Sequence, residues 1–387
     1  MQMHIHFSEA ELAGRRDSAC AAMQQDGLDG LLVFRQESMY WLTGYDTFGY
    51  VWFQCLYLGA DGRMFLLTRA PDLRQAQFTS VIPHDRIHIW ADGHDADPVA
   101  ELKALLNGEG CKGKRLGVEW ESYGLNARNG FRLKAAMEGF ATLEDASFLV
   151  SRLRLVKSPA ELTYVRKAGE LADAALGEAG RLAVAGAFEG DILAAMQGAV
   201  FKGGGDDPAN EYIIGSGPGA LMCRYFTGRR VLEAQDQLTL EFAGVYRHYH
   251  AALMRTIAIG KPHPKHLSMH AAAKDALLAC EAALRPGRPV GEVFDAHARV
   301  LDAAGLSKHR LNACGYSMGT TFAPNWMDWP MLYRGNPVEA APGMVFFIHI
   351  IIFDSDDGVA MTLARSSVVT KTGSEPISKA SLDLMVN

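Results

Sequence analysis

Residues Gln237–Gly260 read QLTLEFAGVYRHYHAALMRTIAIG, and this stretch predicts the centre of the fold. Its two apolar runs, 238–242 and 246–259, are rich in β-branched and aromatic residues, which favours two strands and a tight connection, with Gly244 permitting the turn. Glu241 is the single acidic residue of the stretch and stands between apolar neighbours. A carboxylate in such a place lies either on the wet face of a half-exposed sheet or in a pocket, and the residues alone leave both possibilities open.

The composition describes an ordinary globular protein with room for two domains. The chain has 387 residues, of which 49% are hydrophobic and 21% are charged. A net charge of −6 and the lack of a basic block argue against nucleic acid or an anionic membrane surface as a partner. The six cysteines are scattered without a C-x-x-C pair, and no apolar run approaches the roughly 18 residues of a membrane span. We therefore expect a reduced, cytoplasmic protein.

The first part of the chain alternates helix and strand signals. Ser8, followed by Glu11 three residues later, forms a capping box that predicts a helix over 8–26. The patterns also predict helices at 98–107 and 127–138, and strands at 31–34, 50–59, 64–68 and 115–120. This order predicts an α/β domain over residues 1–150.

A strong helix start at Ser158-Pro159-Ala160-Glu161 opens the second part of the chain. Ser158 is the expected cap and Pro159 takes the first helical position, while Glu161 can reach back to the cap. Helices are predicted at 163–183, 188–203, 263–284 and 289–305, and strands at 340–353 and 359–373. Residues 158–373 therefore contain two rounds of helix, helix and strands.

Glu241, Gly244, Tyr246 and the pair Arg255-Thr256 resemble the strand motif of the pita-bread family, which holds prolidase, aminopeptidase P, creatinase and ectoine hydrolase. The form R-x-x-K-S-x-x-E at 154–161 also resembles the entry to that family's catalytic domain. The resemblance implies an α/β (α+β) protein, with a creatinase-like N-terminal domain at 1–150 and a pita-bread domain with pseudo-two-fold symmetry at 151–387. It also implies a homodimer.

The resemblance places the family's metal ligands on residues that are mostly unable to bind metal. In the dinuclear peptidases of the family two Asp, one His and two Glu bind the ions. Their flanking residues place these five positions on Glu241, Ala252, Tyr316, His349 and Ala364. Two alanines and a phenol leave a dinuclear site open, so we expect no metal, no other cofactor, and a loss of peptidase chemistry.

Several segments are similar to ectoine hydrolase, a member of the family that opens a cyclic amidine without metal. They are EFAGVYRHYH (241–250), the turn Cys314-Gly315-Tyr316-x-x-Gly319, Pro324-Asn325-Trp326, and MYWLTGYD (39–46). Two positions depart from that enzyme, because Arg224 replaces a His and Ala364 replaces a Glu. An arginine in the pocket argues for a carboxylate on the substrate, bound through two hydrogen bonds.

Hydrolysis of an amidine or amide without metal needs a base or nucleophile, a proton shuttle, and groups that hold the substrate's charge. The catalytic candidates are Glu241 as nucleophile or general base, His349 as proton shuttle, and Tyr316 as donor to a developing charge. The substrate-binding candidates are Arg224, His250, Tyr246, Trp326 and Asp328, together with Trp41 and Tyr45, whose loop reaches a neighbouring subunit's site in the family. For Arg224 the alternative is a surface strand position, and for Trp326 and Asp328 it is packing of their loop. For His349, Tyr316, Trp41 and Tyr45 ordinary packing remains the alternative.

The leading hypothesis is a metal-independent hydrolase of a C–N bond in a small ectoine-like or creatine-like carboxylic acid. One alternative is an Xaa-Pro metallopeptidase with rebuilt ligands. The other is a binding protein that has lost catalysis on the same fold.

Overall fold

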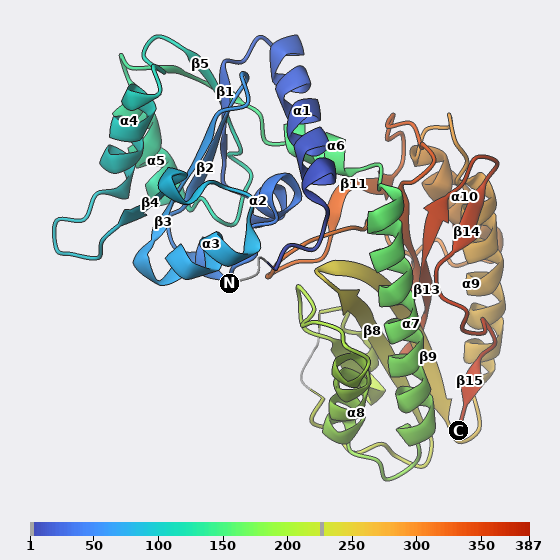
Figure 1. Ribbon diagram of the computed structural model, residues 1–387. Helices are drawn as coiled ribbons and strands as arrows, with labels where there is room; N and C mark the ends of the chain where they lie inside the picture. The colour runs from blue at the N-terminus through green and yellow to red at the C-terminus, as the bar shows by residue number, and fades with distance from the viewer. Residues whose placement is uncertain (1–3, 225–227) are drawn as a thin grey trace. The chain divides into compact units, whose positions relative to one another are not determined.

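The computed structural model describes residues 4–224 and 228–387, and the chain divides into two compact units, Met1–Arg154 and Leu155–Asn387 (Figure 1). No helix among the described residues is long and apolar enough to cross a membrane. All six cysteines are free, and four of them, Cys55, Cys111, Cys280 and Cys314, are buried.

The first unit is a mixed sheet with helices on both faces. Its sheet has six strands in the order β4-β3-β2-β1-β5-β6, with β1 antiparallel to β2 and parallel to β5. The helices are α1 (Glu9–Gln25), α2 (Gln36–Thr43), α3 (Leu73–Thr79), α4 (Pro98–Gly108), α5 (Ala127–Met137) and α6 (Leu149–Arg154). The strands are β1 (Gly30–Val33), β2 (Cys55–Gly59), β3 (Met64–Arg69), β4 (Ile87–Trp90), β5 (Arg115–Val118) and β6 (Thr142–Asp145).

The alternation of buried side chains along these strands produces two separate cores. Leu31 and Val33 of β1 belong to one core with helix α1, whereas Leu32 belongs to the other core with helices α4 and α5. The cap at Ser8 is confirmed, since its side chain accepts the N–H of Glu11. The strand predicted at 50–59 is wrong in its first half, because residues 49–51 form a short 3-10 turn and the strand begins only at Cys55.

The second unit is built on one large sheet. Among the described residues nine strands form it, in the order β11-β10-β12-β13-β9-β8-β7, with β14 beside β13 and β15 beside β9. The helices are α7 (Pro159–Leu182), α8 (Glu189–Lys202), α9 (Pro264–Ala283) and α10 (Gly291–Ala303). The strands are β7 (Ile213–Ser216), β8 (Asp236–Tyr246), β9 (Tyr249–Ile259), β10 (Ala313–Ser317), β11 (Asp328–Tyr333), β12 (Val345–Asp354), β13 (Val359–Val369), β14 (Ser374–Pro376) and β15 (Met385–Val386).

Two similar halves meet at the centre of this sheet. Helices α7 and α8 pack on the β8–β9 half, and helices α9 and α10 pack on the β12–β13 half (Figure 1). Strands β9 and β13 join the halves as antiparallel neighbours. The predicted capping box at the start of α7 is confirmed, with Ser158 and Glu161 each bonded to the other's backbone. The pseudo-two-fold arrangement follows from this repeated pairing of two helices with a hairpin.

The turn of the central hairpin lies later than the sequence suggested. Arg247 and His248, with φ of 50° and 64°, form the connection between β8 and β9. Gly244 instead lies within β8, where an added Cβ would come within 2.0 Å of the carbonyl oxygen of Ala168 on helix α7. Gly244 is therefore required for the close approach of helix to strand and not for a turn.

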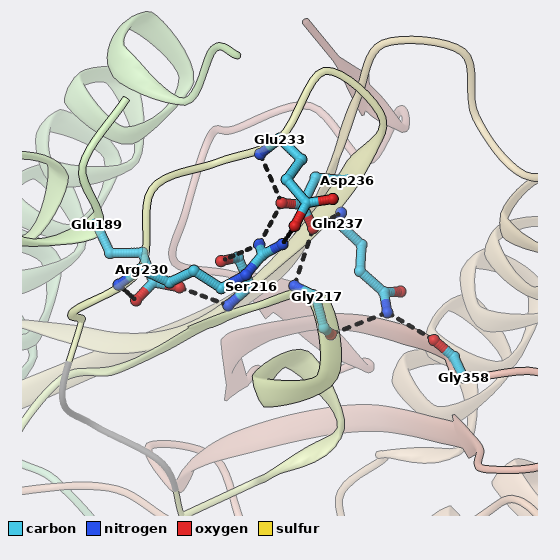
Figure 2. Close-up of polar contacts among 8 residues, drawn as sticks. All are labelled: Glu189, Ser216, Gly217, Arg230, Glu233, Asp236, Gln237 and Gly358. Carbon is cyan, nitrogen blue, oxygen red and sulfur yellow. Dashed lines mark hydrogen bonds and ion pairs between the residues drawn. The ribbon is translucent and has the colours of Figure 1, made fainter. Parts of the chain in front are cut away.

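A polar network fixes the start of β8 (Figure 2). Asp236 accepts the N–H of Gly217 at 2.9 Å and forms an ion pair with Arg230. The buried carboxylate of Glu189 accepts the backbone N–H of Arg230 at 2.9 Å, and Gln237 donates to the carbonyl oxygen of Gly217 at 3.2 Å. The position of β8 along its neighbours, and hence of the residues that it carries, is held by these bonds.

Candidate functional site

One face of the large sheet carries Glu241 and His349 at the two ends of a row of directly paired residues, here called the register row. Glu241 of β8 lies opposite Met254 of β9, Met254 lies opposite Ala364 of β13, and Ala364 lies opposite His349 of β12. Residues that pair directly across strands project from the same face. The neighbours of Glu241 along β8, Leu240 and Phe242, point into the helix-covered core, so the row lies on the face away from those helices.

Glu241 is a half-buried carboxylate in apolar surroundings. Burial raises its pKa to about 7, which the Arg224 guanidinium and a hydrogen bond from Tyr316 only partly oppose. The Tyr316 hydroxyl donates to Oε1 of Glu241 at 3.4 Å. Near neutral pH this group therefore exchanges a proton readily, and it is well suited to act as a base.

Tyr316 connects Glu241 to two other side chains. Its oxygen accepts the indole N–H of Trp326 at 2.8 Å, and its ring lies 5.8 Å from the ring of His349, centroid to centroid. Burial raises the pKa of Tyr316 well above its ordinary value, so the phenol keeps its proton. Along the register row Glu241 and His349 are three strands apart, about 14 Å in a flat sheet, and the phenol of Tyr316 lies between them.

Arg224 supplies positive charge to the site. Its guanidinium is exposed and forms no ion pair or hydrogen bond with the residues 4–224 and 228–387 that the structure describes. It is nevertheless near enough to lower the pKa of both Glu241 and His349 by its charge. An arginine that pairs with none of the described residues and lies near a buried carboxylate can bind an anionic group of a ligand.

His349 is held neutral by its surroundings. Burial, with the positive charges of His297 and Arg224 adding to it, lowers its pKa to about 3. Its Nδ1 atom has no hydrogen-bond partner among the described residues. A neutral imidazole that stays neutral across the physiological range favours hydrogen bonding over the proton shuttling expected from the sequence.

His250 is saturated by protein contacts. Its Nε2 accepts the N–H of Ala209 at 3.0 Å, and its Nδ1 bonds to the carbonyl oxygen of His248 at 2.8 Å. The side chain is fully buried, and burial lowers its pKa to about 3. These bonds favour a role in fixing the loop at Ala209 over the predicted contact with substrate.

The other predicted binding residues lie in packed surroundings. Tyr246 stacks edge-on against Tyr164 of helix α7, with ring centroids 5.6 Å apart. Asp328 is buried on β11 opposite Ser317, and its Oδ1 accepts the N–H of Trp329 at 2.9 Å. These contacts show what holds the two side chains, and their predicted role in binding stays a prediction.

Trp41 and Tyr45 are core residues of the first unit. Trp41 is 5% exposed and lies under the guanidinium of Arg15, 5.1 Å from the ring centroid. Tyr45 is fully buried and its hydroxyl donates to Gln54 at 3.3 Å. In each case a packing role accounts for the residue within its own unit.

The donor chemistry at the five metal-ligand positions does not fit a metal pair. Ala252 and Ala364 are fully buried and carry no donor atom, and Tyr316 holds its proton. Among the described residues no group of three or more His, Cys, Asp or Glu is arranged to hold a metal ion. Glu241 and His349 each contact the phenol of Tyr316, which keeps its proton and is a poor metal ligand.

Residues that the sequence did not indicate contact Trp326 and His250 and support their positions. Asn210 accepts the backbone N–H of Trp326 at 3.3 Å, and Thr321 bonds to Nδ1 of His250 at 3.2 Å. The ring of His248 stacks on Phe322 with centroids 4.1 Å apart. Asn210 and Thr321 lie in loops without periodicity, so no sequence signal distinguishes them from ordinary loop residues.

Comparisons with known proteins agree on the architecture. The model of metallopeptidase family M24 matches residues 163–371, and that of the creatinase/prolidase N-terminal domain matches residues 15–156. An uncharacterized hydrolase/peptidase of Sinorhizobium fredii is 28% identical over 393 residues, covering 99% of each chain. The ectoine hydrolase of Halomonas elongata is 25% identical over 403 residues, covering 100% of each chain.

Solved structures give the same fold. A prolidase from Thermococcus sibiricus superposes with a TM-score of 0.87 at 18% identity, covering 98% of this chain and 100% of that chain. The creatinase-like N-terminal domain and the pita-bread fold expected from the sequence are confirmed.

Proposed function

Because the chain belongs to metallopeptidase family M24, a family of hydrolases, we propose that it hydrolyses a C–N bond in a small ectoine-like or creatine-like carboxylic acid, an amidine or an amide that is not a peptide. One observation carries the proposal. At the centre of the sheet the family's metal-ligand positions include two alanines, while Glu241 is a carboxylate with a pKa of about 7. The reaction then depends on this side chain and not on a metal-bound water.

The proposed chemistry assigns one role to each side chain around Glu241. The carboxylate takes a proton from water as the water oxygen attacks the amidine or amide carbon. Once Glu241 has taken this proton, the Tyr316 hydroxyl can donate to the charge that develops on the attacked group, and the protonated Glu241 then returns its proton to the leaving nitrogen. Arg224 binds the substrate carboxylate, and the neutral His349 hydrogen-bonds to the substrate.

An ectoine-like substrate matches these groups. An amidinium cation next to Glu241 would favour the ionised form of the carboxylate, and the substrate carboxylate would pair with Arg224. The likeness to an ectoine hydrolase along the whole chain supports the same class. The departure at Arg224, where the sequence motif of that enzyme has a His, favours a relative of ectoine over ectoine itself.

Incubation with a panel of substrates tests the proposal. Ectoine, hydroxyectoine, creatine and an Xaa-Pro dipeptide would each be mixed with the full-length protein and the products measured by mass spectrometry. We expect water addition to a small amidine or amide, abolished by Glu241→Gln and unaffected by the matched change Glu375→Gln at an exposed position of β14. Turnover of the dipeptide alone, or full activity of Glu241→Gln, would contradict the proposal.

A single turnover in ¹⁸O-labelled water separates a general base from a nucleophile. If Glu241 acts as the base, the label enters the product in the first turnover. If Glu241 attacks the substrate itself and water then cleaves the intermediate at the Glu241 carboxyl carbon, the first product carries an unlabelled oxygen from the carboxylate. A pKa near 7 favours the base, so we expect label in the first product.

A further inference from the structure

Trp326 is placed in a way that no stacking role explains. Its indole is 1% exposed and ranks among the largest fully buried side chains, so it offers no free face to a substrate cation. It lies in the connection between β10 and β11, close behind Tyr316. Its one polar atom, Nε1, donates a 2.8 Å hydrogen bond to the Tyr316 oxygen.

The direction of this bond determines where the Tyr316 proton points. An indole N–H can donate but cannot accept, so Tyr316 must be the acceptor. The single phenol proton is then left for another acceptor, and Oε1 of Glu241 lies 3.4 Å away. The two hydrogen bonds run in the same direction, from Trp326 to Tyr316 and from Tyr316 to Glu241. Donation from Trp326 polarises the Tyr316 hydroxyl and so strengthens its hydrogen bond to Glu241.

We infer that Trp326 is a positioning residue that aims the Tyr316 proton at Glu241 and so favours the ionised carboxylate. The inference deepens the proposed function, since it rests on Glu241 as the reacting group. Without the indole donor the phenol would turn among several orientations, and its bond to Glu241 would be formed only part of the time. The hydrogen bond that opposes the effect of burial on Glu241 would weaken.

A second layer of contacts keeps the indole in place. Asn210 accepts the backbone N–H of Trp326 at 3.3 Å, and the preceding residue Ala209 donates its N–H to His250. The ring of His250 lies 6.4 Å from that of Trp326, centroid to centroid. His250 therefore supports the loop that carries Asn210, which gives the buried histidine a purpose other than contact with substrate.

The test measures the pKa of Glu241 directly, so it does not require activity. The carboxyl signal of Glu241 would be identified by ¹³C NMR as the one lost in Glu241→Gln, and then titrated in Trp326→Phe, Tyr316→Phe and the double variant. We expect each single change to raise the pKa by about half a unit to one unit, and the double change to raise it no further. An unchanged pKa in Trp326→Phe, or shifts that add in the double variant, would overturn the inference.

Trp90→Phe is the matched control. In the first unit, which holds both residues, the buried indole N–H of Trp90 donates a 2.8 Å hydrogen bond to the carbonyl oxygen of Phe53, so this change also removes a buried indole hydrogen bond. It should leave the Glu241 pKa unchanged, and a shift equal to that of Trp326→Phe would mean that general loosening is responsible. The proposed function and this inference can fail independently. If Glu241→Gln remains active while Trp326→Phe still shifts the pKa of Glu241, the proposed function is wrong and the inference about Trp326 stands. With an active substrate, the acid limb of the rate profile should move by the same amount as the pKa.

Discussion

Replacing Glu241 with glutamine should stabilise the protein at alkaline pH and leave its stability unchanged at acid pH. Burial raises the pKa of this carboxyl from 4.5 to about 7. At 1.36 kcal/mol per unit, ionisation is therefore less favourable in the folded chain than in the unfolded chain by about 3 kcal/mol. Glu241 is half-buried, so water screens part of this penalty, and we expect about 1–3 kcal/mol in practice.

The sign of the pH dependence follows from the direction of the shift. A group whose pKa is raised in the folded state favours folding fully below its unfolded pKa, here near 4.5, and that contribution is lost as the pH rises through about 7. Glutamine does not titrate. The variant should therefore match the parent at pH 4.5 and exceed it by about 1–3 kcal/mol at pH 8.

Urea unfolding between pH 4.5 and pH 8 measures the difference between parent and variant at each pH. Glu375→Gln, at an exposed position, serves as the control and should show no trend with pH. A Glu241→Gln difference that is constant across the range, or a variant that is less stable at pH 8, would refute the effect of burial on the Glu241 carboxyl. The expected gain fits the general conflict between stability and a reactive buried group.

Three further outcomes are expected. Gly244→Ala should lower the free energy of unfolding in urea by about 3 kcal/mol or more, because the new Cβ would lie 2.0 Å from the backbone of Ala168. Gly177→Ala is the control in helix α7: its new Cβ would have no atom within 4 Å, so it should stabilise by about 0.5–1 kcal/mol. Equal effects of the two changes would contradict the close packing of β8 on α7. Arg224→Gln should raise KM for an anionic substrate by about 10- to 100-fold with a small effect on kcat, and equal losses on the substrate's neutral ester would exclude pairing with the carboxylate. Glu119→Ala should destabilise the first unit by about 2–4 kcal/mol, since the buried Glu119 carboxylate accepts the N–H groups of Phe34 and Arg35 at 3.0 and 2.8 Å. Unchanged amide hydrogen exchange over residues 30–43 would contradict this role.

Local signals along the chain predicted much of the fold. The capping pattern at Ser158 gave the start of helix α7, because the bonds that it forms involve residues only three apart. The hairpin turn was misplaced because Arg247 and His248 adopt positive φ without glycine, held by distant contacts such as the stacking of His248 on Phe322. Such a turn has no local sequence signal, since tertiary contacts stabilise it.

Motif spacing predicted candidate residues for the site but not the contacts that each side chain makes. Glu241, Tyr316 and His349 follow from the motif; the register row contains Glu241 and His349, and the side chain of Tyr316 contacts both of them. Whether a side chain faces substrate or protein depends on burial and on the direction of hydrogen bonds, which spacing does not determine. Trp326 and His250 were therefore assigned to the substrate although protein groups occupy their polar atoms.

Whether the reaction needs a metal is tested most directly by measuring turnover and metal content together. The full-length protein would be dialysed against a strong chelator, its bound metal measured, and its activity on the best small amidine or amide substrate compared before and after addition of Mn²⁺, Co²⁺ or Zn²⁺. We predict an undiminished rate with bound metal far below one ion per chain, lost in Glu241→Gln. Activity that disappears with the metal and returns with it would contradict a reaction carried by the Glu241 carboxylate.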